Sequence, residues 1–354
     1  MTDQLPYGAT IGIMGGGQLG RMLSVAAARL GLKTHIFEPS QNPPAGHVAH
    51  LVTMAEYSNT EALVRFASAV DVITYEFENI PTEALNIVQS IRPVHPGRKA
   101  LSIAQDRIDE KVFLSGLGLN VAPYAQIDTL DDLKAALKTI GTPAILKTRR
   151  FGYDGKGQVR ITDIGQAPEA FSALNGAPAV LEGFVDFQRE VSVIAARGLD
   201  GAVVCFDPGE NLHKDGILHT TTIPAALAPG QHMEAVLLAG KILNALDYVG
   251  VMGVELFVTK SALIVNEFAP RVHNSGHWTQ NACLIDQFEQ HIRAIAGWPL
   301  GDGQRHSDAV MTNLIGADIL EYANTSDVGL HLYGKADIKA GRKMGHVNKI
   351  NPKT

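Results

Sequence analysis

A lysine at the end of an apolar run stands directly before a glycine-rich, basic loop. Ala144, Ile145 and Leu146 form the run, and the segment 147–158 reads KTRRFGYDGKGQ. Glycine frees the backbone to bring N–H groups against an anion, and lysine adds a point charge. We predict a buried strand leading to Lys147, a return strand at 158–161 and, between them, a lid over phosphate groups. A surface hairpin with a glycine turn is the alternative.

Two glutamates belong to a second predicted hairpin, with strands at 250–258 and 263–268. If the chain turns about Ser261, Glu255 lies opposite Glu267. Like charges opposed in a sheet repel each other and raise one pKa, so the pair requires a cation. Oxygen ligands from these glutamates and Asn266 suit Mg²⁺ that bridges nucleotide phosphates. A register one residue off would instead leave both carboxylates in solvent.

A third motif, the loop GGGQLG at 15–20, follows a predicted strand at 9–14 and opens a helix. With Glu38 at the end of the next strand, it matches the dinucleotide fingerprint and makes an NAD-dependent oxidoreductase a candidate. The same helix N-terminus could hold another phosphate or a substrate. A tight turn without a ligand is the remaining alternative.

Composition indicates a soluble globular protein of two or three domains, since 354 residues are 45% hydrophobic and 19% charged. The N-terminus has no basic cluster and no stretch approaches the ~18 apolar residues of a membrane helix, so we expect a cytoplasmic enzyme. Cys205 and Cys283 lack CxxC spacing, which favours reduced thiols over a zinc site.

The net charge of −6 hides a basic tail, because residues 335–353 carry +5 and the remainder −11. The tail has no interleaved aromatic residues after Tyr333, so a site for one small phosphate fits better than a nucleic-acid surface.

Strand and helix signals alternate at the start of the chain and predict a βαβ pattern. Strands are expected at 9–14, 34–37 and 72–75, with one helix after Gly20 and another beginning at Pro81. Further helices are expected at 98–115, 130–140, 231–246 and 274–297, and a strand-rich region at 179–224. We place the first domain boundary near residue 105.

These features together resemble the ATP-grasp enzymes, through Lys147, the GYDGKGQ loop, Glu182-Gly-Phe-Val185, Glu190 and the carboxylate pair. Four stretches narrow the resemblance to the 5-(carboxyamino)imidazole ribonucleotide synthases of purine biosynthesis: GGGQLGRM at 15–22, YEFENIP at 75–81, NLHKDGI at 211–217 and NEFAPRVHNSGHWTQ at 266–280. The resemblance runs nearly end to end. Phe151 departs from it, because the family usually has another glycine there.

The resemblance implies an α/β (α+β) architecture, an ATP-grasp fold preceded by a Rossmann-like domain. It divides the chain into a Rossmann-like domain (1–105), a lid domain (106–185) and a C-terminal domain with the metal and substrate sites (186–354). The implied reaction joins ATP, bicarbonate and aminoimidazole ribonucleotide through carboxyphosphate, with Mg²⁺ as cofactor. Small molecules are thus the expected partners, without nucleic acid or membrane, and a homodimer is expected.

Residue roles carried over from the resemblance fall into four groups. The ATP contacts are Arg107, Lys147, Gly152, Tyr153, Asp154, Gly155, Lys156, Gly157, Gln158, Glu182, Gly183, Phe184, Val185, Glu190, His213, Asn266 and Glu267. The metal ligands are Glu255 and Glu267. The catalytic residues are Arg271, His273, Asn274, Lys147 and Asp154. The substrate contacts are Gln18, Leu19, Glu76, Tyr153, Asp154, Arg271, His273, Asn274, Ser275, Lys335 and Arg342.

Within these groups, backbone atoms of Glu182 and Val185 are expected to read the adenine edge. His273 is expected to exchange a proton near neutral pH, and His277 is counted in the same polar cluster. Arg107 could instead pair with Glu110 one helical turn away.

Three other functions stay open at this stage. They are the NAD-dependent oxidoreductase, a formate-dependent purine transformylase of the same superfamily, and an ATP-binding or scaffold protein without activity.

Overall fold

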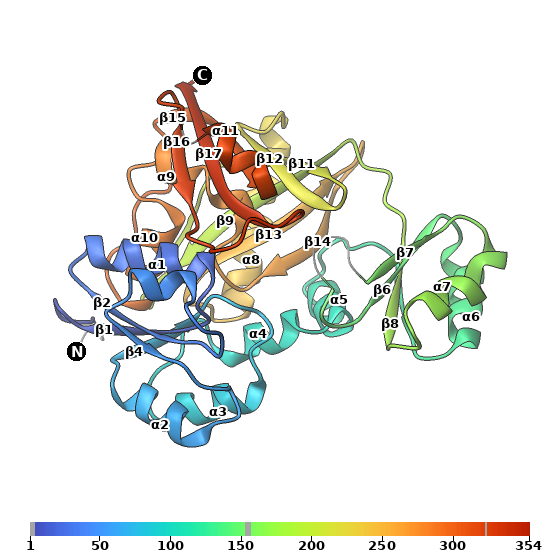
Figure 1. Ribbon diagram of the computed structural model, residues 1–354. Helices are drawn as coiled ribbons and strands as arrows, with labels where there is room; N and C mark the ends of the chain where they lie inside the picture. Colours follow the sequence, from blue (N-terminus) through green and yellow to red (C-terminus); the bar gives the residue numbers. More distant parts are fainter. Residues whose placement is uncertain (1–3, 153–156, 323) are drawn as a thin grey trace.

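Three β-sheets organise the chain, each built from its own stretch of sequence (Figure 1). The structure is a computed structural model and describes residues 4–152, 157–322 and 324–354. The first sheet has the order β3-β2-β1-β4 and is parallel throughout, which confirms the predicted βαβ pattern. Its strands are β1 (Thr10–Met14), β2 (Lys33–Phe37), β3 (Leu51–Thr53) and β4 (Val72–Tyr75).

The second sheet is a small antiparallel one with the order β5-β8-β6-β7. It consists of β5 (Tyr124–Ile127), β6 (Ala144–Thr148), β7 (Gln158–Ile161) and β8 (Ala179–Gly183). The predicted hairpin is present, since Lys147 of β6 pairs with Gln158 of β7. Helices α6 (Leu130–Ile140) and α7 (Ala167–Ala173) close a separate core that includes Leu133, Leu146 and Leu181. This unit projects from the rest of the molecule, at the right of Figure 1.

The third sheet has nine strands among the described residues and forms the body of the C-terminal half. Its main path is β14-β13-β9-β11-β12-β15-β17-β16, and β10 pairs with β9. The strands are β9 (Arg189–Arg197), β10 (Val203–Cys205), β11 (Gly209–Lys214), β12 (Ile217–Ile223), β13 (Gly250–Val258), β14 (Leu263–Ala269), β15 (Ser307–Ile315), β16 (Gly329–Leu332) and β17 (Lys343–Pro352).

The α-helices flank these sheets and connect them. They are α1 (Gln18–Arg29), α2 (Thr60–Ser68), α3 (Thr82–Gln89), α4 (Arg98–Ala104), α5 (Arg107–Gly116), α6 (Leu130–Ile140), α7 (Ala167–Ala173), α8 (Pro229–Ala245), α9 (Thr279–Ala282), α10 (Gln287–Ile295) and α11 (Ile319–Tyr322). Short 3₁₀ turns lie at Pro44–His47, Ile164–Gln166, Asn274–Gly276 and Gly316–Asp318. One core joins the first and third sheets, because Leu23 of α1, Ile194 of β9 and Phe288 of α10 share it.

Two predicted helices are interrupted in the structure. The helix expected at 98–115 breaks before Asp106, whose carboxylate accepts from the N–H of Ile108 and caps α5. Arg149, directly after β6, binds the same carboxylate at 2.8 Å, so the break fastens the second sheet, which we call the lid sheet, to α5. The helix expected at 274–297 is likewise divided into a 3₁₀ turn, α9 and α10, and Asp286 caps α10. Helix α1 begins earlier than predicted, at Gln18.

The two cysteines are free, as the sequence predicts, and Cys283 is buried. No helix in the described part of the chain has the length and apolar character needed to cross a membrane.

Buried imidazoles gather beside the third sheet. His277, His291 and His346 are at most 1% exposed. The rings of His277, His346 and His331 follow one another at 4.7 and 4.6 Å, and Tyr333 Oη lies 2.9 Å from His346 Nδ1. Burial lowers the pKa of each of these histidines below its ordinary value. Burial therefore favours the neutral form of these rings in the folded protein.

We predict that acid weakens the fold through this cluster. The unfolded chain binds protons to histidine below about pH 6.5 while the folded chain does not, so stability is lost as pH falls through that value. Between pH 7.5 and 5.5, the free energy of unfolding of His346→Asn should fall by about 1.4 kcal/mol less than that of the wild type. Urea unfolding at the two pH values measures this difference. Glu110 and Glu255 have raised pKa values, so they add stability as pH falls. Their contribution is the same in the wild type and the variant, and it cancels when the two pH slopes are compared.

The matched control is His306→Gln, at an exposed position outside the cluster, which should change the slope less than His346→Asn does. Equal pH slopes in the wild type and His346→Asn would contradict the assignment.

Candidate active site

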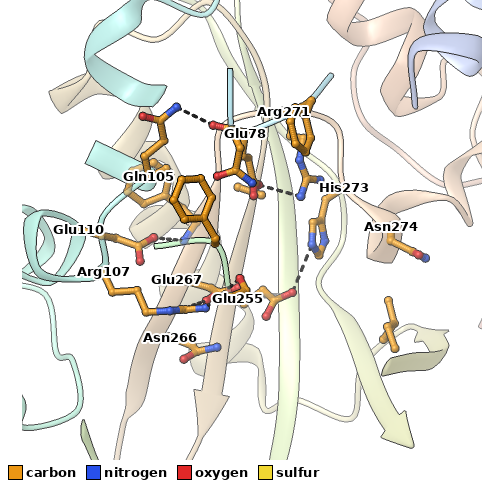
Figure 2. Close-up of a pocket in the computed structure, with 18 of the residues that line it drawn as sticks. Glu78, Gln105, Arg107, Glu110, Glu255, Asn266, Glu267, Arg271, His273 and Asn274 are labelled. Carbon is orange, nitrogen blue, oxygen red and sulfur yellow. Dashed lines mark hydrogen bonds and ion pairs between the residues drawn. The ribbon is translucent and has the colours of Figure 1, made fainter. Parts of the chain in front are cut away.

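A cavity of about 950 Å³ lies where the three sheets meet. Residues from the GGGQLG loop, α5, the lid hairpin, β13, β14 and the segment after β14 all line it. The cavity is lined by these predicted site residues: Gln18, Leu19, Glu76, Arg107, Lys147, Gly152, Gln158, His213, Glu255, Asn266, Glu267, Arg271, His273 and Asn274. Segments far apart in sequence therefore supply a single pocket, part of which is shown in Figure 2.

The carboxylate pair lies on the wall of this cavity. Glu255 of β13 is the register partner of Glu267 of β14, as predicted, with a bulge directly after Glu255. Burial and the neighbouring charge of Glu267 raise the pKa of Glu255 to about 7. Although burial opposes it, the guanidinium of Arg107 lowers the pKa of Glu267 to about 2. One carboxylate of the pair is thus ionised throughout the neutral range, and the other titrates within it.

Nitrogen donors reach the pair from two sides (Figure 2). Arg107 Nη1 lies 2.8 Å from Glu267 Oε2, so Arg107 serves this carboxylate and the alternative pairing with Glu110 is wrong. Glu110 instead accepts from the N–H of Phe268 at 2.7 Å. On the other side, His273 Nε2 lies 3.4 Å from Glu255 Oε1.

Two lysines share one buried glutamate beneath the lid hairpin. Lys147 Nζ lies 3.1 Å and Lys111 Nζ 3.4 Å from Glu182 Oε2. Although burial opposes it, Lys147 and Lys111 lower the pKa of Glu182. Lys111 also donates to the carbonyl of Asn266 at 2.7 Å. This ionic cluster connects the lid sheet through α5 to the strand that carries Glu267.

The predicted adenine-reading segment, 182–185, lies outside the cavity lining, at the end of β8. Glu182 is paired with both β5 and β6, and its side chain serves the lysines. The N–H groups of Gly183 and Phe184 donate to Pro123 and Pro143. Contact with adenine therefore stays a prediction for this segment. Glu190, also outside the lining, pairs with His213 at 2.6 Å, which raises the pKa of His213 against the effect of burial.

The lid loop is described at its two ends. Tyr153, Asp154, Gly155 and Lys156 lie outside the described residues. Gly157 adopts φ +72°, and a Cβ there would lie 2.7 Å from Thr148 Oγ1, so glycine is required. Phe151 also has positive φ, +62°, and its side chain is 69% exposed. Phe151 thus adopts the left-handed backbone that glycine adopts more readily.

The GGGQLG loop is already occupied by carboxylates of the protein. Glu76 accepts from Gly17 N–H at 2.8 Å and from Gly20 N–H at 3.3 Å, and Glu38 accepts from Gly16 N–H at 2.7 Å. A dinucleotide pyrophosphate would have to displace both side chains. The NAD interpretation of the fingerprint is wrong because the anion site of the helix is filled from within.

The polar cluster after β14 divides into a cavity face and a buried face. Arg271 Nη2 binds Glu78 at 2.7 Å, and Asn274 Nδ2 donates to Asn313 at 3.0 Å. His277 instead lies in the core, 1% exposed, with Nδ1 2.9 Å from Gln287 Nε2. The prediction that His277 belongs to this polar cluster is wrong, because the side chain lies in the core after the 3₁₀ turn at 274–276 and does not line the cavity.

The charges around His273 disagree with the proton exchange expected of this ring. Burial and the positive charges of Arg271 and Lys343 lower its pKa to about 3. The ring is neutral at neutral pH in this structure, so the expected proton exchange near pH 7 is not supported. Ser275 is buried behind the ring and lies outside the cavity lining.

The basic tail reaches the cavity through a residue that the sequence did not single out. Lys343 lines the cavity, whereas Lys335 and Arg342 do not. Lys335 Nζ donates to the carbonyl of Lys343 at 2.6 Å, and Arg342 donates to the carbonyl of Asp337 at 3.3 Å.

Sequence reasoning also gave no site role to five polar residues of the lining: Glu78, Asn79, Gln105, Glu110 and Arg149. Glu78 and Asn79 stand inside the YEFENIP stretch and Arg149 inside KTRRFGYDGKGQ, so these motifs were the available signal. Gln105 and Glu110 flank the break between α4 and α5, which the sequence did not predict.

Comparison with known proteins agrees with this geometry. Residues 8–105 match the ribonucleotide synthetase preATP-grasp domain, 112–288 the ATP-grasp domain, and 309–354 the phosphoribosylaminoimidazole carboxylase C-terminal domain. The N5-carboxyaminoimidazole ribonucleotide synthase of Brucella melitensis is 55% identical over 99% of this chain and 98% of its own. That of Bacillus subtilis is 41% identical over 98% and 93%.

The chain belongs to the N5-carboxyaminoimidazole ribonucleotide synthase family. Solved structures agree: an ADP complex of such a synthetase superposes with a TM-score of 0.96 at 40% identity, covering 99% of this chain and 94% of that one. The Aspergillus clavatus enzyme with ADP and 5-aminoimidazole ribonucleotide gives 0.91 at 30% identity, covering 98% and 94%. The family consists of ATP-dependent ligases with the ATP-grasp fold preceded by an N-terminal domain, as the sequence predicts.

We predict that the ionic cluster under the lid contributes strongly to stability. Lys111→Met removes a buried cation from Glu182 and from the Asn266 carbonyl, and should cost about 3 kcal/mol of unfolding free energy in urea titrations. The exposed Lys138→Met in α6 should stay within about 0.5 kcal/mol of the wild type. Equal stabilities of the two variants would remove the cluster from the forces that hold the lid.

Proposed function

We propose that this chain carboxylates 5-aminoimidazole ribonucleotide with bicarbonate, by way of carboxyphosphate, at the expense of ATP. The products are 5-(carboxyamino)imidazole ribonucleotide, ADP and phosphate, in purine biosynthesis. The observation that carries the proposal is one cavity that joins the opposed carboxylates to the Arg271–Asn274 segment, in a chain of this family. The match to this family, including its C-terminal domain, speaks against the formate-dependent transformylase.

The nucleotide end of the site is assigned to the lid hairpin and the two glutamates. Lys147 at the end of β6 would neutralise phosphate charge, and the glycine loop would bring backbone N–H groups to it. Phosphoryl transfer needs mainly positioning and charge neutralisation, and these side chains supply both. Arg107, held against Glu267, adds a further positive charge.

Mg²⁺ fits the opposed pair. No group of three or more His, Cys, Asp or Glu in the described residues could hold a metal by itself. Magnesium sites commonly use one or two carboxylates together with substrate phosphates, and here Glu255 and Glu267 face one cavity with Asn266 beside them. Bound there, the ion would offset the developing charge on the transferred phosphoryl group.

The acceptor end is assigned to Arg271, His273 and Asn274. A guanidinium binds the planar oxyanion of bicarbonate or carboxyphosphate through paired hydrogen bonds. Phosphorylation activates the carbon of bicarbonate, and the exocyclic amine of the ribonucleotide then captures it. Gln18, Leu19 and Glu76 border this end of the cavity and are proposed to hold the base and ribose.

The basic tail is proposed to receive the 5′-phosphate of the ribonucleotide. Lys335 and Arg342 keep that role from the sequence analysis, and Lys343 joins them because it faces the cavity. The domain limits 1–105, 106–185 and 186–354, a homodimer and a cytoplasmic location complete the proposal.

The activity test is phosphate release with ATP, bicarbonate and aminoimidazole ribonucleotide, omitting each in turn. Full release should require all three together with Mg²⁺, and ATP with Mg²⁺ should raise the melting temperature where NADH does not. Release that formate supports and bicarbonate does not would assign the transformylase reaction instead.

For the metal pair, we expect Glu267→Gln to lower turnover by more than about a hundredfold with the fold intact, because it removes a carboxylate ligand. Circular dichroism and steady-state rates at saturating Mg²⁺ would be measured. Glu234→Gln, at an exposed position of α8, is the matched control and should keep full activity. Wild-type turnover in Glu267→Gln would exclude this residue from the metal site.

Arg342→Ala should raise KM for the ribonucleotide by about ten- to a hundredfold, since a charge-assisted contact with phosphate is lost. KM for ATP should change little. Lys339→Ala, an exposed cation of the same tail, is the control and should leave both constants unchanged. An equal rise in both KM values for Arg342→Ala would mean that this residue supports the site without binding the phosphate.

A further inference from the structure

Two buried hydroxyl groups lead to one ring nitrogen of His273. Ser192 Oγ donates to Ser275 Oγ at 2.7 Å, and Ser275 Oγ lies 2.8 Å from His273 Nδ1. Both serines are 1% exposed. Ser192 lies on β9 directly opposite Glu255 of β13, so its side chain projects from the same face of the sheet as that carboxylate.

The backbone of Ser275 identifies the role of Nδ1. The Ser275 N–H donates to His273 Nδ1 at 3.4 Å. Because an N–H group can only donate, Nδ1 must act as an acceptor, and Ser275 Oγ must give its proton to the same atom. The neutral ring then carries its single proton on Nε2. That nitrogen points toward the cavity, 3.4 Å from Glu255 Oε1 (Figure 2).

The hydroxyls are not needed to hold the backbone of this segment. Gln287, fully buried at the start of α10, accepts from His273 N–H at 2.9 Å and donates to His273 C=O at 2.8 Å. The backbone is thus fixed from the α10 side, and the serines act on the ring alone.

We propose that Ser192 and Ser275 are positioning residues that fix His273 as the Nε2–H tautomer. His273 then serves as a neutral hydrogen-bond donor to an oxygen of the bicarbonate or carboxyphosphate oxyanion, and not as a base. The oxyanion as ligand rests on the proposed function, whereas the tautomer rests on the hydrogen bonds alone.

The tautomer is tested directly by ¹H–¹⁵N NMR of protein labelled with ¹⁵N-histidine at pH 7.5. His273 is assigned from the signals that disappear in His273→Gln. The expected pattern has a protonated Nε2 and an unprotonated Nδ1. A protonated Nδ1 would overturn the proposal, whatever the activity of the protein.

The hydroxyl chain is tested by a double-mutant cycle on phosphate release with all three substrates. Ser275→Ala should lower kcat by about five- to tenfold, with KM for ATP nearly unchanged, because one neutral hydrogen bond to the ring is lost. Ser192 acts through Ser275, so Ser192→Ala should have a smaller effect, and the double variant should be no slower than Ser275→Ala. If the decreases in kcat of the two single variants multiplied in the double variant, the two serines would act independently, which would contradict the chain of hydroxyl groups.

Ser24→Ala is the matched control. Ser24 is equally buried, and its Oγ has no hydrogen-bond partner within the described residues, so kcat and both KM values should stay at the wild-type level. A loss in Ser24→Ala equal to that in Ser275→Ala would assign the effect to core packing. Absence of any release by the wild type would instead reject the proposed function, and the NMR result would still decide the tautomer.

Discussion

Electrostatic repulsion between Glu255 and Glu267 is the constraint around which the cavity is built. The sheet register places the two carboxylates opposite each other on neighbouring strands, where like charges are unfavourable. The chain offsets this with Arg107 from α5 at Glu267, and with the titration of Glu255 shifted into the neutral range. A pair maintained at such a cost is suited to a divalent cation that both carboxylates can share.

The same need for compensation links the lid to the rest of the protein. Glu182 is buried at the end of a lid strand and would be unstable without a partner, so Lys147 and Lys111 pair with it from different elements. Lys111 also holds the carbonyl of Asn266, next to Glu267. One connected set of charges therefore joins the lid sheet to the strand that carries Glu267.

Beyond the pair, the structure shows a site built from donors. Arg271 is oriented by Glu78, and His273 is neutral, with its acceptor nitrogen occupied by Ser275. Arg271 and Nε2 of His273 are donors on this side of the cavity, and donors of this kind suit an oxyanion bound beside them. At the GGGQLG loop, by contrast, Glu76 and Glu38 already accept from the backbone N–H groups. This is why the loop does not act as a dinucleotide site.

The sequence by itself determined the parts whose causes are local. Apolar runs bounded by glycine located both hairpins, the spacing about Ser261 set Glu255 opposite Glu267, and the motifs identified the family. Tertiary structure decided the partners. Arg107 pairs with Glu267, 160 residues away, in preference to Glu110 on its own helix. Likewise His277, four residues from His273, enters the core, because one 3₁₀ turn rotates it away from the cavity. Charge pairing and burial depend on which distant segments meet, and periodicity and spacing along the chain carry no information about that.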